Sequence, residues 1–249
     1  MHLIAVTFAD HFSTIAARYA TYRPRYPAAL VDALADRSAT HTAWDIGCGS
    51  GQLSVSLAER FDRVIATDPA QAQLDAVLAH PRVEYCCSPA EESGLPEASV
   101  DLAVAAQAAH WFDWPRFVVE VGRVARPGAL IALVSYGSID IDGAVNDELR
   151  RYREIIEPYW PPERVHVDNG YRDLVLPWPA VDAPAIDMTA TWTRDQLLGY
   201  IQTWSATVKL VDREGRAPVI AMCERFAAVW PDDEVRTLRW PLTLRFARR

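Results

Sequence analysis

The stretch from 43 to 52, AWDIGCGSGQ, places three glycines at alternate positions after an acidic residue. A short apolar lead precedes it, and residues 53–60 follow with the pattern of a helix. Glycines between a strand and a helix let the backbone approach a ligand closely, because no Cβ intervenes and positive φ angles are accessible. Dinucleotide-binding folds instead use G-x-G-x-x-G and bind a pyrophosphate at the helix N-terminus. The pattern D-x-G-x-G-x-G therefore favours a ligand without phosphates that lies flat across the loop.

An acidic residue follows the second predicted strand. Residues 63–67 are apolar enough for a buried strand and are followed by Asp68. A carboxylate at this position can accept hydrogen bonds from both hydroxyls of a ribose. The alternative is that Asp68 caps the next helix, with Pro69 as its first residue, and the two roles are compatible. The position supports an adenosine-containing ligand.

Strands and helices alternate along the first half of the chain. Strands are predicted over 83–87, 100–106 and 129–135, and helices over 71–79 and 114–124. The nearly continuous apolar run 100–106 is typical of a strand covered on both faces. This alternation predicts an α/β fold with a doubly wound, mostly parallel sheet and right-handed crossovers. We expect a single domain over residues 1–249.

Two regions interrupt the alternation. Residues 10–36 predict two helices, over 10–20 and 28–35, joined by an Arg-Pro turn, and we interpret them as an N-terminal lid. The alternative is a connector whose tyrosines pack on the domain. Residues 137–184 contain an amphipathic helix followed by proline- and tryptophan-rich chain. A loop of this length is usually functional or disordered, and its tryptophans favour an inserted cap over the carboxyl edge of the sheet.

The last third of the chain predicts further elements. Residues 186–192 read as a strand, and Thr193 with Gln196 forms a capping-box pattern for a helix that continues through Trp204. A helix is predicted over 217–229, and alternating apolar residues over 238–246 predict a final strand. Because Pro241 lacks a backbone donor, we expect a bulge or an exposed edge there.

The residues after the strand 100–106 are the main candidates for chemistry. Open α/β sheets bind ligands at the carboxyl ends of their strands, which is where Gln107 and the segment 108–112 are placed. His110 has a suitable ordinary pKa for a general base, but it could also be a structural residue that caps the next helix. Trp111 and Phe112 could contact a substrate or belong to the core.

Charge and cysteine content limit the function classes. The net charge is −8 and the isoelectric point is about 5.3, which argues against a nucleic-acid partner. No stretch has the length of a membrane span, and the first residues lack the basic start of a signal peptide, so we expect a cytoplasmic protein. The four cysteines form no metal-ligand or disulfide pattern, so no metal site is predicted.

Together these features resemble class I S-adenosyl-L-methionine (SAM)-dependent methyltransferases of the type-11 family. More narrowly, YRPRYP, PAEESGLPEASVDLAVAAQAAHWFD and the TWSA stretch at Thr203 resemble the trans-aconitate methyltransferase-like group of small-molecule enzymes. The resemblance implies a seven-stranded Rossmann-like sheet whose last strand is antiparallel. It implies SAM as cofactor, with S-adenosyl-L-homocysteine as product.

Site residues follow from the motifs and from the resemblance. The expected cofactor-binding residues are Asp45, Gly47, Gly49, Gly51, Asp68, Pro69, Ser88, Ala90, Glu91 and Gln107. The expected catalytic residues are His110, Tyr22 and Arg23. The expected substrate-binding residues are Tyr19, Arg25, Tyr26, Trp111, Phe112, Tyr136, Trp160 and Trp178. Ser88 stands where relatives often have an acid.

The predicted function is methyl transfer to an oxygen or nitrogen atom of a small, planar or acidic metabolite, as in secondary metabolism. Arginines suit an acidic acceptor, and tryptophans suit a planar one or the sulfonium. The alternatives are a SAM-binding protein without catalysis, a macromolecule methyltransferase and a nicotinamide-dependent oxidoreductase, whose G-x-G-x-x-G pattern is absent. We expect a monomer or a weak homodimer.

Overall fold

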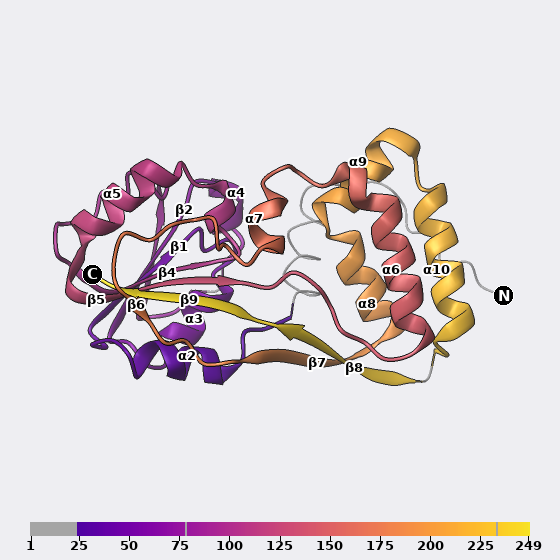
Figure 1. The fold of residues 1–249 in the computed structure, drawn as a ribbon, viewed down its shortest axis with the longest axis horizontal. Coiled ribbons are helices and arrows are strands. Elements are labelled where there is room, and N and C mark those ends of the chain that lie inside the picture. The colour runs from indigo at the N-terminus through magenta and orange to yellow at the C-terminus, as the bar shows by residue number, and fades with distance from the viewer. Residues whose placement is uncertain (1–23, 78, 233) are drawn as a thin grey trace.

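A mixed sheet forms one of two lobes in the structure, a computed structural model that describes residues 24–77, 79–232 and 234–249 (Figure 1). Its seven strands lie in the order β3-β2-β1-β4-β5-β9-β6. Their bounds are β1 Thr42–Ile46, β2 Arg63–Asp68, β3 Val83–Cys87, β4 Val100–Ala106, β5 Ala125–Ser135, β6 Ala180–Val181 and β9 Thr243–Arg248. β9 runs antiparallel to β5 and β6, whereas the first five strands are parallel. The α/β class and the antiparallel last strand are confirmed.

Helices cover both faces of this sheet. α2 (Ala28–Ala35) and α3 (Gln52–Leu57) pack on one face through Leu30, Leu34 and Leu57, which are fully buried. α5 (Trp114–Val124) covers the other face and is capped by the Asp113 side chain. The short helix α4 (Gln71–Leu74) follows β2 and ends earlier than the predicted helix 71–79.

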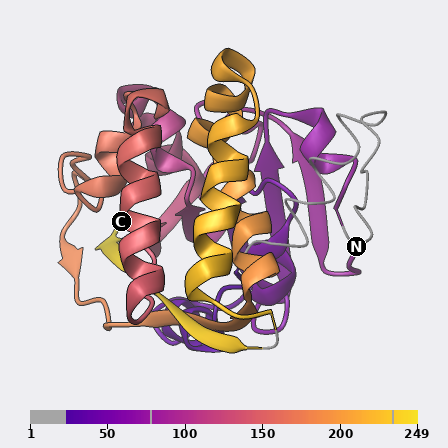
Figure 2. The same cartoon turned by 90° about the vertical axis from the view of Figure 1, so that its right-hand side faces the viewer.

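The second lobe is helical and stands beside the carboxyl edge of the sheet. It contains α6 (Ala144–Ile156), α8 (Arg194–Gln202), α9 (Ser205–Glu214) and α10 (Ala217–Val229). Figure 2 looks onto this lobe and shows α6 and α10 side by side, with the sheet behind them. β7 (Asp187–Thr193) and β8 (Val235–Pro241) form an antiparallel ribbon that joins the lobes, and α7 (Arg164–Asp168) lies between them.

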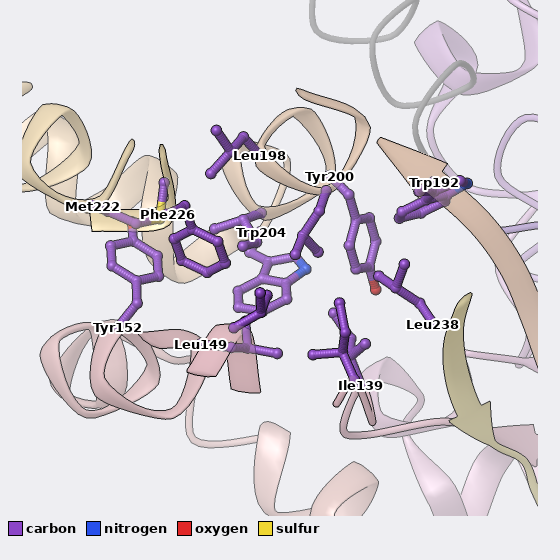
Figure 3. Close-up of a cluster of buried hydrophobic side chains, with 14 of the residues drawn as sticks. Ile139, Leu149, Tyr152, Trp192, Leu198, Tyr200, Trp204, Met222, Phe226 and Leu238 are labelled. Atoms are coloured by element: carbon purple, nitrogen blue, oxygen red, sulfur yellow. The ribbon is translucent and has the colours of Figure 1, made fainter. Parts of the chain in front are cut away.

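An aromatic core holds the helical lobe together. α6 buries Val145, Leu149, Tyr152 and Ile156, the residues that its sequence period predicts. Figure 3 shows Trp204 and Tyr200 reaching into this cluster beside Leu149 and Ile139. The predicted capping box between Thr193 and Gln196 is present at the start of α8. That helix ends at Gln202 rather than at Trp204 because the chain turns directly into α9.

The structure corrects three boundaries. The predicted lid helix 28–35 is α2, and its apolar side packs on the sheet instead of covering the glycine loop. The rest of the expected lid, residues 10–23, lies outside the described residues. The expected cap 137–184 is only part of the helical lobe, because α8, α9 and α10 share its core and β6 returns to the main sheet. Instead of one strand, residues 235–248 form β8 and β9 in different sheets, separated after Pro241.

No helix in the described ranges is both long enough and apolar enough to cross a lipid bilayer.

Candidate active site

The glycine loop joins β1 to α3 and is tied to the end of β2. The amides of Gly47 and Cys48 donate to the carbonyl oxygen of Thr67 at 2.8 and 2.9 Å. The amide of Gly49 donates to Asp68 Oδ2 at 2.9 Å, and the amide of Ala70 donates to Oδ1 at the same distance. Asp68 therefore orders the loop through its carboxylate, and each oxygen keeps a further lone pair for a ligand.

Two glycines of the loop are required by their geometry. Gly47 has a φ of +68°, and a Cβ there would lie 2.5 Å from the Cβ of Ala108. Gly51 has a φ of +77°, and a Cβ there would lie 2.5 Å from the hydroxyl oxygen of Tyr85. Both positions combine a left-handed backbone with a close approach that only glycine permits.

A cavity of about 590 Å³ opens above this loop, and we call it the donor cavity. Its lining consists of Tyr26, Asp45, Gly47, Cys48, Gly49, Ser50, Gln52, Leu53, Ala106, Gln107 and Tyr136. Asp45 is 1% exposed, and its Oδ2 accepts a 2.6 Å hydrogen bond from Ser54 Oγ. Burial, with a smaller contribution from the nearby Asp68 carboxylate, raises the pKa of Asp45 to about 7, although the Ser54 bond opposes that shift.

Gln107 stands between two cavities in a strained conformation. Its φ is +56°, a left-handed value that is costly for a residue with a side chain and is often found at ligand sites. Its amide nitrogen Nε2 donates to the carbonyl oxygen of Tyr136 at 2.7 Å. Its Oε1 is buried and has no hydrogen-bond partner among the described residues. An unpaired buried acceptor next to the glycine loop fits a ligand that brings a donor such as an ammonium group.

A second cavity, of about 840 Å³, lies between the sheet and the helical lobe, and we call it the acceptor cavity. Its lining consists of Gln107, His110, Trp111, Tyr136, Gly137, Arg153, Trp160, Pro161, Arg164, Val167, Tyr200, Thr203, Trp204 and Ser205. Gln107 and Tyr136 line both cavities, so the two spaces meet at the end of β4. This junction is where groups held in the two cavities can react.

Two arginines converge on one carbonyl in the acceptor cavity. Nη2 of Arg153 donates to the oxygen of Gly137 at 3.0 Å, and Nη2 of Arg164 donates to the same oxygen at 3.2 Å. Arg164 also pairs with Asp168 at 2.9 Å and lies 4.5 Å above the ring of Trp160. Burial and, secondarily, the neighbouring Arg164 charge lower the pKa of Arg153. Two adjacent positive charges in a partly buried cavity favour an anionic ligand.

His110 reaches the acceptor cavity from the short helix η1 (Ala109–Trp111). Its Nδ1 lies 2.9 Å from the hydroxyl oxygen of Tyr171, and its ring lies 4.8 Å from that of Trp111. Burial, with the nearby Arg164 charge, lowers the pKa of His110 to about 4. The histidine does not cap α5, because Asp113 does so and Glu91 Oε1 accepts the Asp113 amide at 2.6 Å. His110 is therefore a neutral side chain at the cavity wall.

The low pKa of His110 has a measurable consequence for stability. In the unfolded chain the imidazole takes up a proton near its ordinary pKa of 6.5, whereas the folded protein keeps it neutral down to about 4. The unfolded state thus binds more protons in this window, so His110 makes the protein less stable as pH falls through it. Asp45 acts in the same window with the opposite sign, because its pKa is raised in the folded protein, so the test compares the variant with the wild type. We expect the free energy of unfolding of His110→Gln, measured by urea denaturation, to rise relative to that of the wild type as pH falls from about 6.5 to about 4. An unchanged slope in the variant would contradict the assignment.

The other expected cofactor residues surround the far end of the loop. Asp68 closes β2 as expected, and Pro69 follows it on the surface. The hydroxyl oxygen of Ser88 is buried and unpaired within the described part of the chain, so it is available to a ligand. Ala90 is buried in the core under α5, and Glu91 is engaged at the start of α5. Of the three residues expected around the adenine, Ser88 has a hydroxyl available to a ligand, whereas Ala90 and Glu91 have structural roles.

The expected substrate residues separate into three sets. Tyr26, Tyr136, Trp111 and Trp160 line the two cavities. Phe112 packs on Phe117 and Trp178 packs on Gly122 of α5, so both belong to the core side of the sheet, and Arg25 is exposed outside either lining. Tyr19, which was expected to bind the substrate, lies outside the described residues, as do Tyr22 and Arg23, which were expected to be catalytic.

Four functional candidates were missed from the sequence. Arg153 lies on an amphipathic helix whose charged residues are expected to face solvent, and Arg164 lies in a proline-rich stretch. Tyr200 lies on α8 and Trp204 lies just before α9, and both are buried aromatic residues of a kind typical of core positions. Among the sequence features, only the resemblance of the TWSA stretch at Thr203 indicated this part of the wall of the acceptor cavity.

Comparisons with known proteins agree with this geometry. A family model described as a methyltransferase domain matches residues 44–133. A candidate methyltransferase of Dictyostelium discoideum is 36% identical over 205 residues, which cover 80% of this chain and 78% of the relative. An uncharacterised methyltransferase of Mycobacterium tuberculosis is 39% identical over 124 residues, about half of either chain.

Solved structures extend the similarity to the whole architecture. A candidate type II methyltransferase from Anaeromyxobacter dehalogenans is 46% identical, with a TM-score of 0.85 over 91% of this chain and 98% of its own. A candidate methyltransferase from an antibiotic biosynthesis pathway of Anabaena variabilis has a TM-score of 0.55 at 18% identity, covering 85% of this chain and 96% of its own. The second likeness shows the fold alone. The first extends over the helical lobe as well as the sheet.

Proposed function

The chain belongs to the class I SAM-dependent methyltransferases of the type-11 family, and on that premise we propose that it methylates a carboxylate oxygen of a small, planar metabolite. The observation that carries the acceptor class is the convergence of Arg153 and Arg164 on the Gly137 carbonyl. The finer placement in the trans-aconitate methyltransferase-like group is part of the same proposal.

The donor cavity fits the cofactor by two observations. Gly47 and Gly51 hold the loop backbone in left-handed conformations against Ala108 and Tyr85, which shapes the floor of the cavity, and Oε1 of Gln107 is a buried acceptor that lacks a donor in the described chain. We assign the glycine loop to the methionyl part, Gln107 to its ammonium group and Asp68 to the ribose hydroxyls. When bound, the cofactor supplies a methyl group on a positively charged sulfur, which makes that carbon electrophilic.

The acceptor cavity fits an anion better than a neutral molecule. Arg153 has no carboxylate partner within ion-pair distance in the described ranges, and its guanidinium lies 5.8 Å from the Trp204 ring. A carboxylate between the two guanidinium groups would reduce their mutual repulsion and gain charge-assisted hydrogen bonds. The rings of Trp160 and Trp204 offer flat walls, 5.9 Å apart between centroids, which favour a planar acceptor.

A carboxylate acceptor also agrees with the chemistry of His110. A phenol, an amide or a ring N–H must lose a proton during methylation, which requires a base that is effective near neutral pH. His110 is a weak base, because its pKa is lowered to about 4. A carboxylate is already ionised, so the cavity needs only to orient it, and positioning supplies much of the rate. In this scheme His110 and Tyr136 form a neutral wall beside the reacting oxygen.

The proposal is tested by a methyl-transfer screen with the full chain and methyl-labelled SAM. The panel contains small planar carboxylic acids, their methyl esters, phenols and N-heterocycles of similar size. We expect label transfer to carboxylic acids and base-labile methyl ester products, and no transfer to the preformed esters. Transfer to phenols or heterocycles alone would overturn the carboxylate assignment. Tight S-adenosyl-L-homocysteine binding without turnover on any acceptor would favour the alternative of a SAM-binding protein without catalysis.

Gln107 provides a separate test of the donor cavity. We expect Gln107→Leu to weaken SAM binding by about 10- to 100-fold, because the ammonium loses an acceptor worth roughly 1.5–3 kcal/mol. The same variant also loses the hydrogen bond from Nε2 to the Tyr136 carbonyl, so we expect its stability to fall by about 0.5–1.5 kcal/mol. Isothermal titration and thermal unfolding measure the two effects. Gln71→Leu, on the exposed start of α4, is the control and should leave SAM affinity unchanged.

A further inference from the structure

The two cavities differ in the sign of their charge. Among the described residues that line the donor cavity there is no lysine, arginine or histidine, and Asp45 is the one ionisable carboxyl group. The acceptor cavity instead contains the charged side chains of Arg153 and Arg164 beside the neutral His110. The donor side is thus an acidic space joined at Gln107 to a basic one.

Asp45 is an unusual group to place at a ligand cavity. It is 1% exposed and is held by one side-chain hydrogen bond, from Ser54 Oγ at 2.6 Å. No described cation lies within ion-pair distance of its carboxyl group. The ionised form of a buried carboxyl group is unfavourable in free energy when no counter-charge is near. Asp45 is therefore stabilised either by binding a proton or by a cation that enters the cavity.

The groups that surround Asp45 make this cost larger. Asp68 at the end of β2 is a second carboxyl group close enough to disfavour ionisation of Asp45. Cys48 in the loop and Tyr85 on β3 are the other titratable neighbours. Burial raises the pKa of the Cys48 thiol and raises that of Tyr85 to about 12, so both are neutral at physiological pH. Ser54 from α3 contributes a neutral hydroxyl.

We propose that Asp45 makes the donor cavity select the positively charged cofactor over its uncharged product, and that its carboxyl group releases a proton when the cofactor binds. SAM carries a net charge of +1 through its sulfonium, and S-adenosyl-L-homocysteine is a neutral zwitterion. Both ligands carry the ammonium group that we assign to Gln107, so the sulfonium charge is what distinguishes them at ionised Asp45. When the methyl group leaves, the sulfonium charge disappears and Asp45 takes a proton back from solvent.

The expected change of SAM affinity with pH follows from the protonation equilibrium of Asp45. Because the pKa of Asp45 is near 7 in the free protein, the group is mostly protonated at about pH 6 and mostly ionised at about pH 8. A cofactor cation that lowers this pKa by about two units would bind roughly tenfold more tightly at the higher pH. The product lacks the sulfonium charge, so its affinity should change less between the two pH values. Asp45 is therefore a specificity-determining residue for the cofactor, with no role at the reacting atoms.

The test is isothermal titration of the full chain with SAM and with S-adenosyl-L-homocysteine at about pH 6 and about pH 8. Repeating each titration in buffers of different ionisation enthalpy counts the protons released. We expect close to one proton released by SAM at the lower pH and a smaller fraction by the product. Asp45→Asn should lose the proton release and most of the preference for SAM. Equal proton release by both ligands, or an unchanged preference in the variant, would overturn the proposal.

Two further variants separate this effect from a folding defect. Ser54→Ala removes the hydrogen bond that favours ionised Asp45, so the pH dependence of SAM binding should move to higher pH. Asp101→Asn removes another buried carboxyl group of the sheet, one that pairs with Arg126 away from both cavities, and should leave the SAM preference unchanged. An unmoved midpoint in Ser54→Ala would also contradict the proposal. None of these measurements involves the acceptor, so their failure would leave the carboxylate assignment untouched.

Discussion

Gly47→Ala is expected to abolish measurable cofactor binding and to lower the stability of the fold by several kcal/mol. Its φ of +68° costs a residue with a Cβ about 1–2 kcal/mol. The new Cβ would also lie 2.5 Å from the Cβ of Ala108, and overlap of this kind costs about 1–3 kcal/mol more. Since neither atom can rotate away, the loop or the end of β4 must move. Thermal unfolding and SAM titration measure the two effects.

The chain offers a matched control for this prediction. Gly128 also has a left-handed φ, +84°, but no atom lies within 4 Å of the position that a Cβ would occupy. Gly128→Ala should therefore lose only about 1–2 kcal/mol of stability and keep full SAM affinity. If Gly47→Ala and Gly128→Ala bound SAM equally well, the close contact between Gly47 and Ala108 would not be needed for cofactor binding.

The second large effect is expected at Arg153. Arg153→Gln should lower kcat/KM for a carboxylate acceptor by roughly 100-fold or more, because the loss of a desolvated charge partner costs about 2–5 kcal/mol. SAM affinity should not change, since Arg153 lines the acceptor cavity alone. Steady-state kinetics with an acceptor from the screen, together with SAM titration, separates the two cavities.

Arg151→Gln is the control for the same helix. Arg151 lies two residues away on α6 and is exposed, so its loss should change kcat/KM little. Arg153→Lys should recover only part of the activity, because an ammonium group cannot reproduce the fork of a guanidinium. Similar losses in Arg151→Gln and Arg153→Gln would indicate a general charge effect on α6 instead of a binding role.

The two proposals together would give methyl transfer a simple electrostatic form. A cofactor cation on the acidic side would meet a carboxylate on the basic side, and the sulfonium and carboxylate charges would both be lost in the products. Gln107 and Tyr136, which line both cavities, lie where the two groups would meet.

Some elements were predictable from short stretches of sequence. Strands β3 and β4 and helix α5 have the predicted bounds, since the apolar pattern of each element is contained in its own five to eleven residues. The glycine loop and Asp68 lie close together in the chain, and their spacing alone indicated the class of cofactor. The charge and hydrophobic period of the sequence did not predict the environment of residues that could pack in either of two places. Trp178 and Trp160 look alike in sequence, yet one packs on α5 and the other lines a cavity.

By itself the sequence determined the α/β class, the family and the cofactor, because the residues that encode them are neighbours on one strand-loop-helix unit and the strand beside it. Only the tertiary structure decided what faces the acceptor. The packing of α6, α7 and the turn between α8 and α9 brings Arg153, Arg164 and Trp204 to the same space, although they are separated along the chain. No local pattern shows which side of an amphipathic helix will meet another lobe, because that depends on long-range packing that the helix does not encode alone.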